Sequence, residues 1–299
     1  MPILNQINLR HAKGDLFGGV TAAIIALPMA LAFGVASGAG AEAGLYGAVM
    51  IGLFAALFGG TPTLISEPTG PMTVVFTAVI TSLIAADPEN GLAMAFTTVM
   101  LTGVFQLLFG IMKLGRYVTM MPYTVISGFM SGIGIILIII QLPALLGHAS
   151  PGGGVLGALG ALPDLVASLK PGELALGLLS LGILFFTPAR WRRLVPPQLV
   201  ALVVGTLVAV WVIGSGQYRE IGEIPAGLPS LQLPTFSADQ WRIILIDALV
   251  LAMLGSIDAL LTSVIADSLT RTQHNSDKEL MGQGLGNLAS GLVGGLPGA

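Results

Sequence analysis

Apolar stretches with almost no charged residue follow one another along nearly the whole chain, and this restricts what the chain can fold into. Only 9% of the residues are charged, whereas about 25% are charged in an ordinary soluble domain. So few charges cannot cover the surface of a soluble protein of 299 residues. The chain has 41 glycines, many inside the apolar stretches, where glycine lets membrane helices approach closely. The sequence therefore predicts an all-α, multi-spanning membrane protein.

Composition also excludes several classes of function. The chain has no cysteine, so disulfides, thiolate zinc sites and cysteine nucleophiles are excluded. Its net charge of −3 argues against a nucleic-acid partner. No HExxH motif occurs, and no Ser/His or Asp pair is expected at a common depth. The chain is therefore not expected to be an enzyme, and no catalytic residue or organic cofactor is predicted.

The apolar stretches predict nine membrane segments, because a bilayer core about 30 Å thick needs about 20 apolar residues as helix. They cover residues 15–36, 42–59, 69–86, 91–112, 122–146, 172–188, 196–213, 243–266 and 279–295. Between them, residues 148–171 form a Gly/Pro-rich connection, and residues 214–240, which contain charges and prolines, form an extramembrane loop.

The distribution of Lys and Arg predicts the orientation, because cytoplasmic loops carry an excess of positive charge. With the N-terminus inside, the cytoplasmic side holds Arg10, Lys13, Lys113, Arg116, Arg190, Arg192, Arg193, Arg271 and Lys278. We therefore expect a multi-pass protein of the cell inner (plasma) membrane with a cytoplasmic N-terminus.

The first interruption of the helical pattern runs from Gly59 to Thr73 and contains three prolines and three glycines. Such a stretch cannot form a continuous helix, and Val74–Ala86 is too short to span the membrane alone. We expect an extended stretch that reaches mid-membrane and a half-helix that begins near Thr69, because irregular backbone at that depth must line a cavity or be buried in protein. An ordinary cytoplasmic loop is the alternative.

The start of a half-helix presents free N–H groups and the positive end of the helix dipole, which suits an anion. Pro68 and Pro71 fit such a start, and the hydroxyls of Thr69 and Thr73 add donors. Glu67 either supports the start of the half-helix or binds protons in coupling.

A second interruption, Gly294–Ala299, resembles the sequence around the first: a small-residue helix ends in Gly-Gly and is followed by Pro. Paired Gly/Pro interruptions are typical of transporters built from inverted repeats. The predicted organisation is a cytoplasmic N-terminus at 1–14, a first repeat at 15–240 and the start of a second repeat at 241–299.

Asp258 is the acidic residue that is expected nearest the middle of a membrane segment, about 16 Å of helix from Asp247. A carboxylate at that depth is a candidate functional group. Thr262 follows on the same helical face and Ser256 lies within a turn, so hard oxygen ligands for Na⁺ are expected. A proton carrier and a purely structural carboxylate are the alternatives. Pro28 either opens the wall of a substrate cavity or only kinks its helix.

Four parts of the sequence form recognisable motifs: Gly14–Ala23 with Leu27–Ala30, Glu67–Pro71, Tyr123–Phe129 and Ser256–Ser263. They resemble motifs of the sulfate permease (SulP) family of anion transporters. The resemblance implies two inverted repeats of seven helices, alternating access and homodimers, usually with a cytoplasmic STAS domain after the membrane domain. The sequence stops at Ala299, where the tenth helix would begin, so the remainder of the second repeat and any STAS domain are expected to be absent.

The resemblance also implies site residues. Thr69 and Gly70 correspond to anion ligands, and Asp258 and Thr262 correspond to a sodium site, with Thr262 close to the anion. The function so implied is sodium-coupled bicarbonate uptake, with a small inorganic anion, Na⁺ and the lipid bilayer as partners. A proton-coupled sulfate or dicarboxylate transporter and an anion channel are the alternatives.

Overall fold

The computed structural model describes residues 4–5, 10, 12–118, 120, 122–149, 151, 154–192, 195–214, 218–220, 227 and 229–299. Arg193, one of the predicted cytoplasmic cations, lies outside these ranges. The chain divides into two compact units, one formed by Met1–Gly134 with Glu223–Ala299 and the other by Ile135–Gly222. The described residues are helical apart from connections and a single isolated β-bridge, which confirms the all-α class.

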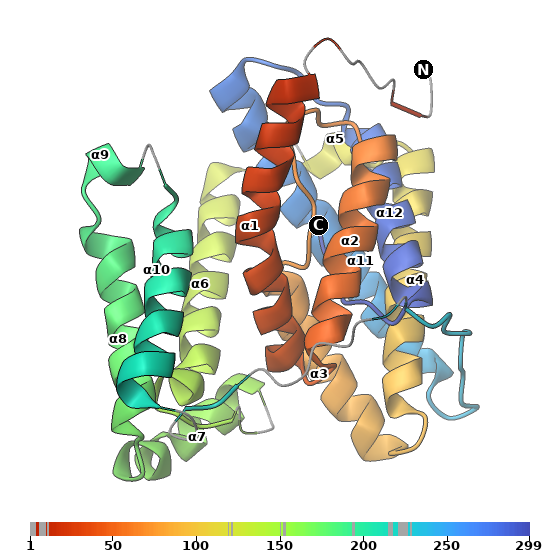
Figure 1. Cartoon of the computed structure of the whole chain (residues 1–299). Coiled ribbons are helices and arrows are strands. Elements are labelled where there is room, and N and C mark those ends of the chain that lie inside the picture. The colour runs from red at the N-terminus through yellow and green to blue at the C-terminus, as the bar shows by residue number, and fades with distance from the viewer. Residues whose placement is uncertain are drawn as a thin grey trace. The chain divides into compact units, whose positions relative to one another are not determined.

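Figure 1 shows the helices of the first unit. Those that lie wholly within it are α1 (Ala12–Ser37), α2 (Ala41–Phe58), α3 (Gly70–Ala86), α4 (Gly91–Ile111), the single turn α5 (Gly115–Val118), α11 (Trp241–Thr270) and α12 (Ser276–Leu292). α6 (Tyr123–Leu145) begins in this unit and continues into the second.

α12 packs against both α4 and α2, although more than 160 residues separate it from α4 in the sequence (Figure 1). The contact with α4 is a close backbone approach: a Cβ on Gly284 would lie 2.7 Å from the carbonyl oxygen of Gly103. α11 packs on α3 and α4, and α1 packs on α2 and α3. The buried core includes Met72, Phe76 and Leu251, which join α3 to α11.

The second unit is formed by the remainder of α6 with α7 (Gly154–Ala167), α8 (Pro171–Phe186), α9 (Ala189–Arg192), α10 (Pro197–Val208) and the π-helical turn η2 (Ala209–Ile213). α10 packs on α8. The prediction of a plain Gly/Pro-rich connection over 148–171 is wrong, because α7 occupies most of it and meets α8 at an angle of 116°. Pro163 does not end α7, whose apolar residues recur at helical spacing around it.

All nine predicted membrane segments coincide with helices, in order α1, α2, α3, α4, α6, α8, α10 with η2, α11 and α12. By length and composition, four helices in the described part of the chain can cross a membrane, or five if the bent pair of α7 and α8 counts as one span. α3, α10 with η2 and part of α6 are apolar but shorter.

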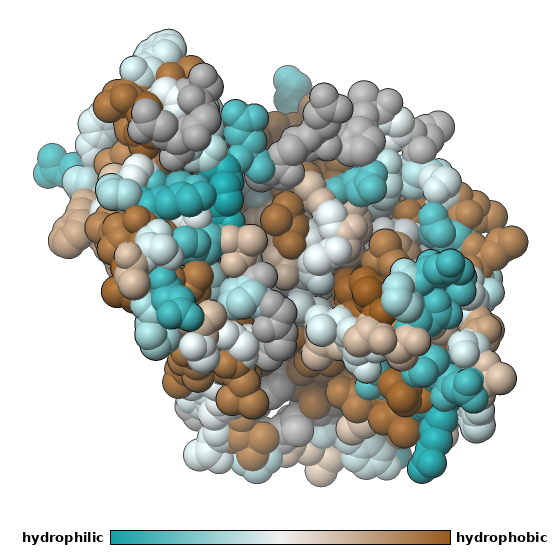
Figure 2. All heavy atoms as spheres, turned by 90° about the horizontal axis from the view of Figure 1, so that it is seen from below, coloured by the Kyte–Doolittle hydropathy of each residue, from teal (hydrophilic) through white to brown (hydrophobic). Residues whose placement is uncertain are grey.

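The sides of the helices carry exposed hydrophobic side chains, among them Leu16, Phe17 and Phe186, as expected for surfaces that face lipid. Figure 2 views the molecule from below, and on that face hydrophilic residues gather in several groups among the hydrophobic ones.

The turn between α3 and α4 is organised by Asp87, which accepts hydrogen bonds from the backbone N–H groups of Glu89 and Asn90 and from the Asn90 side chain. The Asn90 hydrogen bonds lower the pKa of the Asp87 carboxyl. A lowered folded-state pKa contributes stability above the ordinary Asp pKa of about 3.9, and that contribution is lost as pH falls through the folded-state value.

In thermal unfolding, we therefore expect the Asp87→Asn variant to lose less stability than the wild type between pH 6 and pH 3. Parallel losses in both proteins would contradict this expectation.

Candidate functional site

The first broken segment lies between α2 and α3. α2 ends at Phe58, the backbone from Gly59 to Thr69 is not helical, and α3 begins at Gly70 with Thr69 as its N-cap. The predicted start of a helix near Thr69 is confirmed. The N–H groups of Gly70 and Met72, in the first turn of α3, have no acceptor within the helix, and Pro71 between them has no N–H.

The second broken segment, Val293–Ala299, follows α12 and lies beside the first (Figure 1). Pro68 and Gly298 form an antiparallel β-bridge. On one side of it, the N–H of Glu67 donates to the carbonyl of Ala299 at 3.4 Å, and the N–H of Ala299 donates to the carbonyl of Glu67 at 3.2 Å. The two interruptions that the sequence predicted therefore meet, and they meet directly before the first residue of α3.

Gly298 is required by this pairing. A Cβ at this position would lie 2.6 Å from the carbonyl carbon of Glu67 and 2.8 Å from the nitrogen of Pro68. Both are backbone atoms that cannot move aside without separating the two segments.

Asp258 lies in the middle of α11, buried against the start of α3. Its side chain is 7% exposed, and its Oδ2 has no hydrogen-bond partner among the described residues. The hydroxyl of Thr69 lies near this carboxyl group, and it too has no hydrogen-bond partner in the described part of the chain. Three residues before Asp258, Gly255 packs against Met72 of α3. The structure thus brings Thr69 and Asp258 together.

The other predicted sodium ligands on α11 are placed differently. Thr262 lies one turn after Asp258 on the same face, and its hydroxyl donates to the Asp258 carbonyl at 2.9 Å, so its oxygen can still coordinate a cation. Ser256 lies about 200° around the helix from Asp258, and its hydroxyl donates to the carbonyl of Ala252 at 2.6 Å. Asp258 and Thr262 therefore share a face, and Ser256 is directed elsewhere.

The supporting residues predicted from the sequence lie around the same place. Glu67 and Pro68 belong to the paired segment, and Oε2 of Glu67 has no partner among the described residues. Thr73, one turn into α3, is buried, and its hydroxyl is likewise unpartnered. Pro28 lies inside α1, which continues through it and contacts α3.

The site therefore combines one buried carboxylate with a helix N-terminus and threonine hydroxyls. None of the buried polar side chains in the described part of the chain is a Lys or an Arg. No group of three or more His, Asp or Glu side chains that could hold a metal ion is found there either. Such a set of oxygens suits a weakly held alkali cation, and the N–H groups of α3 suit an anion beside it.

Sequence reasoning missed the part of α12 that carries this arrangement. Four polar side chains on one face of α12 are buried, and each bonds a broken segment: Glu279, Gln283, Asn287 and Ser290. Their spacing of 4, 4 and 3 residues is a sequence signal for a polar helix face, and it could have identified them.

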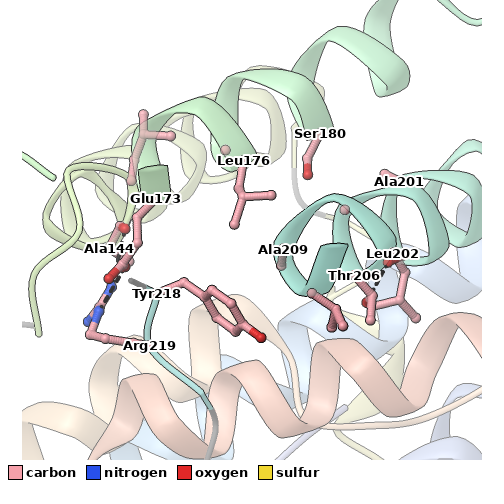
Figure 3. A pocket seen from close by; sticks show the side chains of 14 residues that line it. Ala144, Glu173, Leu176, Ser180, Ala201, Leu202, Thr206, Ala209, Tyr218 and Arg219 are labelled. Atoms are coloured by element: carbon pink, nitrogen blue, oxygen red, sulfur yellow. Dashed lines mark hydrogen bonds and ion pairs between the residues drawn. The ribbon is translucent and has the colours of Figure 1, made fainter. Parts of the chain in front are cut away.

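The structure also contains two cavities, and the first is lined in part by Val293 and Gly294 at the start of the second broken segment. In the first unit, one of about 570 Å³ is lined by the starts of α2 and α4 and includes Glu42 and Glu89. In the second unit, one of about 450 Å³ lies among α6, α8 and α10 (Figure 3). There Glu173 and Arg219 point toward each other in an ion pair of 2.9 Å, and the Tyr218 ring points into the space below Leu176. The paired charges offer no net charge to an ion.

Residues 12–299 match the Sulfate permease family. The chain belongs to this family. Its SulP relatives include the "Bicarbonate transporter BicA" of Synechocystis, 70% identical over 299 residues, and that of Picosynechococcus, 65% identical over 303 residues. A "Putative sulfate transporter" of Bacillus subtilis is 32% identical. These matches cover 97–100% of this chain but only 53–54% of each relative, so the chain spans about half the length of the curated relatives it matches.

Solved structures agree with the fold. The transmembrane domain of a cyanobacterial BicA superposes with a TM-score of 0.93 at 69% identity, covering all of this chain and 77% of that one. SLC26A9 superposes with a TM-score of 0.80 at 19% identity over 98% of this chain and 50% of its own, and shows the fold alone. The predicted SulP membership and transporter fold are confirmed, and the relatives are named as transporters.

Proposed function

We propose that this chain belongs to a secondary transporter that takes up bicarbonate together with Na⁺ by alternating access. The observation that carries the proposal is the buried pair of unpartnered oxygens, Asp258 Oδ2 and Thr69 Oγ1, at the first turn of α3. The identity of 65–70% with proteins named bicarbonate transporters favours bicarbonate as the anion.

Each ligand has an assigned place in this proposal. The anion binds the N–H groups of Gly70 and Met72 and the Thr69 hydroxyl at the start of α3. Na⁺ binds the Asp258 carboxylate and the Thr262 hydroxyl, with Thr262 also close to the anion. Glu67, Pro68 and Thr73 support the start of α3.

Coupling follows from the charge of Asp258. Without a cation, the carboxylate repels an anion: two like charges about 6 Å apart repel by about 3 kcal/mol at an effective dielectric constant of about 20. That repulsion lowers anion affinity by roughly 100-fold. A bound Na⁺ neutralises the carboxylate and removes the repulsion, and by linkage the anion raises the affinity for Na⁺ by the same factor. The absence of a buried Lys or Arg from the described residues favours a monovalent anion over a divalent one.

We also propose that the N-terminus is cytoplasmic in the inner membrane and that the protein is a homodimer. Basic residues occur at the start of α1, between α4 and α5 and in the turn between α11 and α12. α5 packs on both α11 and α12 at the end of the helices where these residues lie, and this grouping of positive charge supports the orientation. Asp87 and Glu89 lie in the turn at the other end of α4.

Uptake assays on the protein expressed at the full length of its relatives test this proposal. We expect radiolabelled bicarbonate to accumulate in a saturable way with external Na⁺ and at less than about a tenth of that rate with K⁺, given the roughly 100-fold coupling. Sulfate and fumarate are expected to compete weakly. Uptake of sulfate or fumarate that follows a proton gradient would indicate the proton-coupled alternative, and a conductance without saturation would indicate a channel.

A further inference from the structure

The buried polar face of α12 runs along one side of the helix for most of its length. Glu279, Gln283, Asn287 and Ser290 are at most 1% exposed. Polar side chains are unfavourable in a membrane helix, so a buried row of four on one face calls for a specific role.

The first two members hold both ends of the first broken segment. Oε2 of Glu279 accepts from the N–H of Gly60 at 2.8 Å, where the segment leaves α2. Nε2 of Gln283 donates to the hydroxyl of Ser66 at 2.6 Å, shortly before α3 begins. The same amide donates to Oε1 of Glu279 at 2.8 Å, so the two contacts form one connected chain.

The next two members hold the second broken segment. Asn287 uses both ends of its amide on one residue: Nδ2 donates to the Gly298 carbonyl at 2.8 Å, and Oδ1 accepts from the Gly298 N–H at 2.9 Å. Ser290 donates to the carbonyl of Leu296 at 2.6 Å. Asn287 also donates to Oε1 of Gln106 on α4 at 2.8 Å, which fixes its own position.

We propose that this face of α12 sets the register of the two broken segments, and that Gln283 and Asn287 are positioning residues for ion binding. The inference rests on the proposed function for its transport readout. Gln283 acts through Ser66, three residues before Thr69, and Asn287 acts through Gly298, the bridge partner of Pro68. Together they fix where the Thr69 hydroxyl and the first turn of α3 lie relative to Asp258.

A double-mutant cycle on the full-length protein tests the Gln283–Ser66 contact. Gln283→Leu and Ser66→Ala both remove the hydrogen bond from the Gln283 amide to the Ser66 hydroxyl, and Gln283→Leu also removes the bond from this amide to Glu279. The loss of one such hydrogen bond corresponds to about a tenfold change. We therefore expect each variant to raise the KM for bicarbonate and for Na⁺ by about tenfold, with the maximal rate per transporter changed less than about twofold. The double variant is expected to be no worse than Gln283→Leu alone, because both changes remove the same contact.

Thr81→Val is the matched control, since this hydroxyl lies on α3 and, among the described residues, bonds only the carbonyl of Thr77 in its own helix. It should leave both KM values unchanged. Effects of Gln283→Leu and Ser66→Ala that add in the double variant, or that reduce only the amount of folded protein, would overturn the inference.

Hydrogen exchange of the purified protein gives a second readout that does not need transport. The amides of residues 60–69 are expected to exchange at least about tenfold faster in Gln283→Leu than in the wild type or Thr81→Val. Equal exchange in all three would overturn the positioning role. If the wild type takes up no bicarbonate with Na⁺, the proposed function fails, and hydrogen exchange still decides the role of α12.

Discussion

The Asp258→Asn variant of the full-length protein is expected to lose sodium-dependent bicarbonate uptake. The substitution keeps the size of the side chain and removes its charge. At contact, about 4 Å, the attraction of a carboxylate for Na⁺ is about 4 kcal/mol at an effective dielectric constant of about 20. Its loss corresponds to roughly a thousandfold weaker Na⁺ binding, which leaves the site empty at ordinary sodium concentrations. Initial rates of radiolabelled bicarbonate uptake over a range of external Na⁺ measure this effect.

Asp247→Asn is the control for this variant. Asp247 lies on the same helix, eleven residues nearer its start and partly exposed, so the same chemical change there should keep sodium-dependent uptake. Sodium-dependent uptake at the wild-type level in Asp258→Asn would disprove the assignment of the sodium site. Uptake that persists but no longer depends on Na⁺ would assign Asp258 to coupling alone.

Gly298→Ala is expected to abolish transport and to destabilise the protein. The added methyl group would meet the Glu67 carbonyl and the Pro68 nitrogen, and neither can rotate away as a side chain could. Overpacking of this kind costs about 1–3 kcal/mol. The structure can avoid the clash only by separating the two broken segments, which displaces the first turn of α3 from Asp258. Uptake below about a tenth of the wild-type rate, together with a lower Tm in detergent, is the expected result.

Gly182→Ala in α8 is the matched control, because no atom of the described residues lies within 4 Å of a Cβ built there. Alanine favours helix over glycine by about 1 kcal/mol, so this variant should be at least as stable as the wild type and should transport normally. A Gly298→Ala protein that transports like Gly182→Ala would show that the pairing of the two segments is not needed for function.

Much of the fold could be predicted because hydropathy reports directly on membrane helices. Each predicted segment coincides with a helix, and the start of α3 at Gly70 is within one residue of the predicted Thr69. The three prolines and three glycines from Gly59 to Thr73 interrupt the helical pattern, so the next helix is expected to begin near Thr69. α7 was missed because the glycines and prolines around it were taken as signs of a connection throughout, whereas glycine is common in membrane helices.

The candidate site was only partly accessible to sequence reasoning. The second interruption could be predicted from its glycines and proline. Its bridge to the first interruption could not, because it depends on a tertiary contact between Pro68 and Gly298, which are 230 positions apart. The same holds for the approach of Thr69 to Asp258. Helical spacing alone distinguishes the two hydroxyls. Thr262, four residues from Asp258, lies on the same face of the helix, and Ser256, two residues from Asp258, does not. The roles of Thr69, Gly70, Asp258 and Thr262 in binding stay predictions.

The polar face of α12 also bears on how the protein is made. A helix that carries Glu279, Gln283 and Asn287 is a poor candidate to partition into lipid by itself as it leaves the translocon. Two of its hydrogen-bonding partners, Gln106 on α4 and Ser66 between α2 and α3, are synthesised much earlier. α12 therefore has to pack against α2 and α4, which have already assembled. Synthesis from the N-terminus makes α2 and α4 before α12, as this packing requires. A substitution that delayed the assembly of α2 and α4 would be expected to leave α12 unpacked and susceptible to degradation.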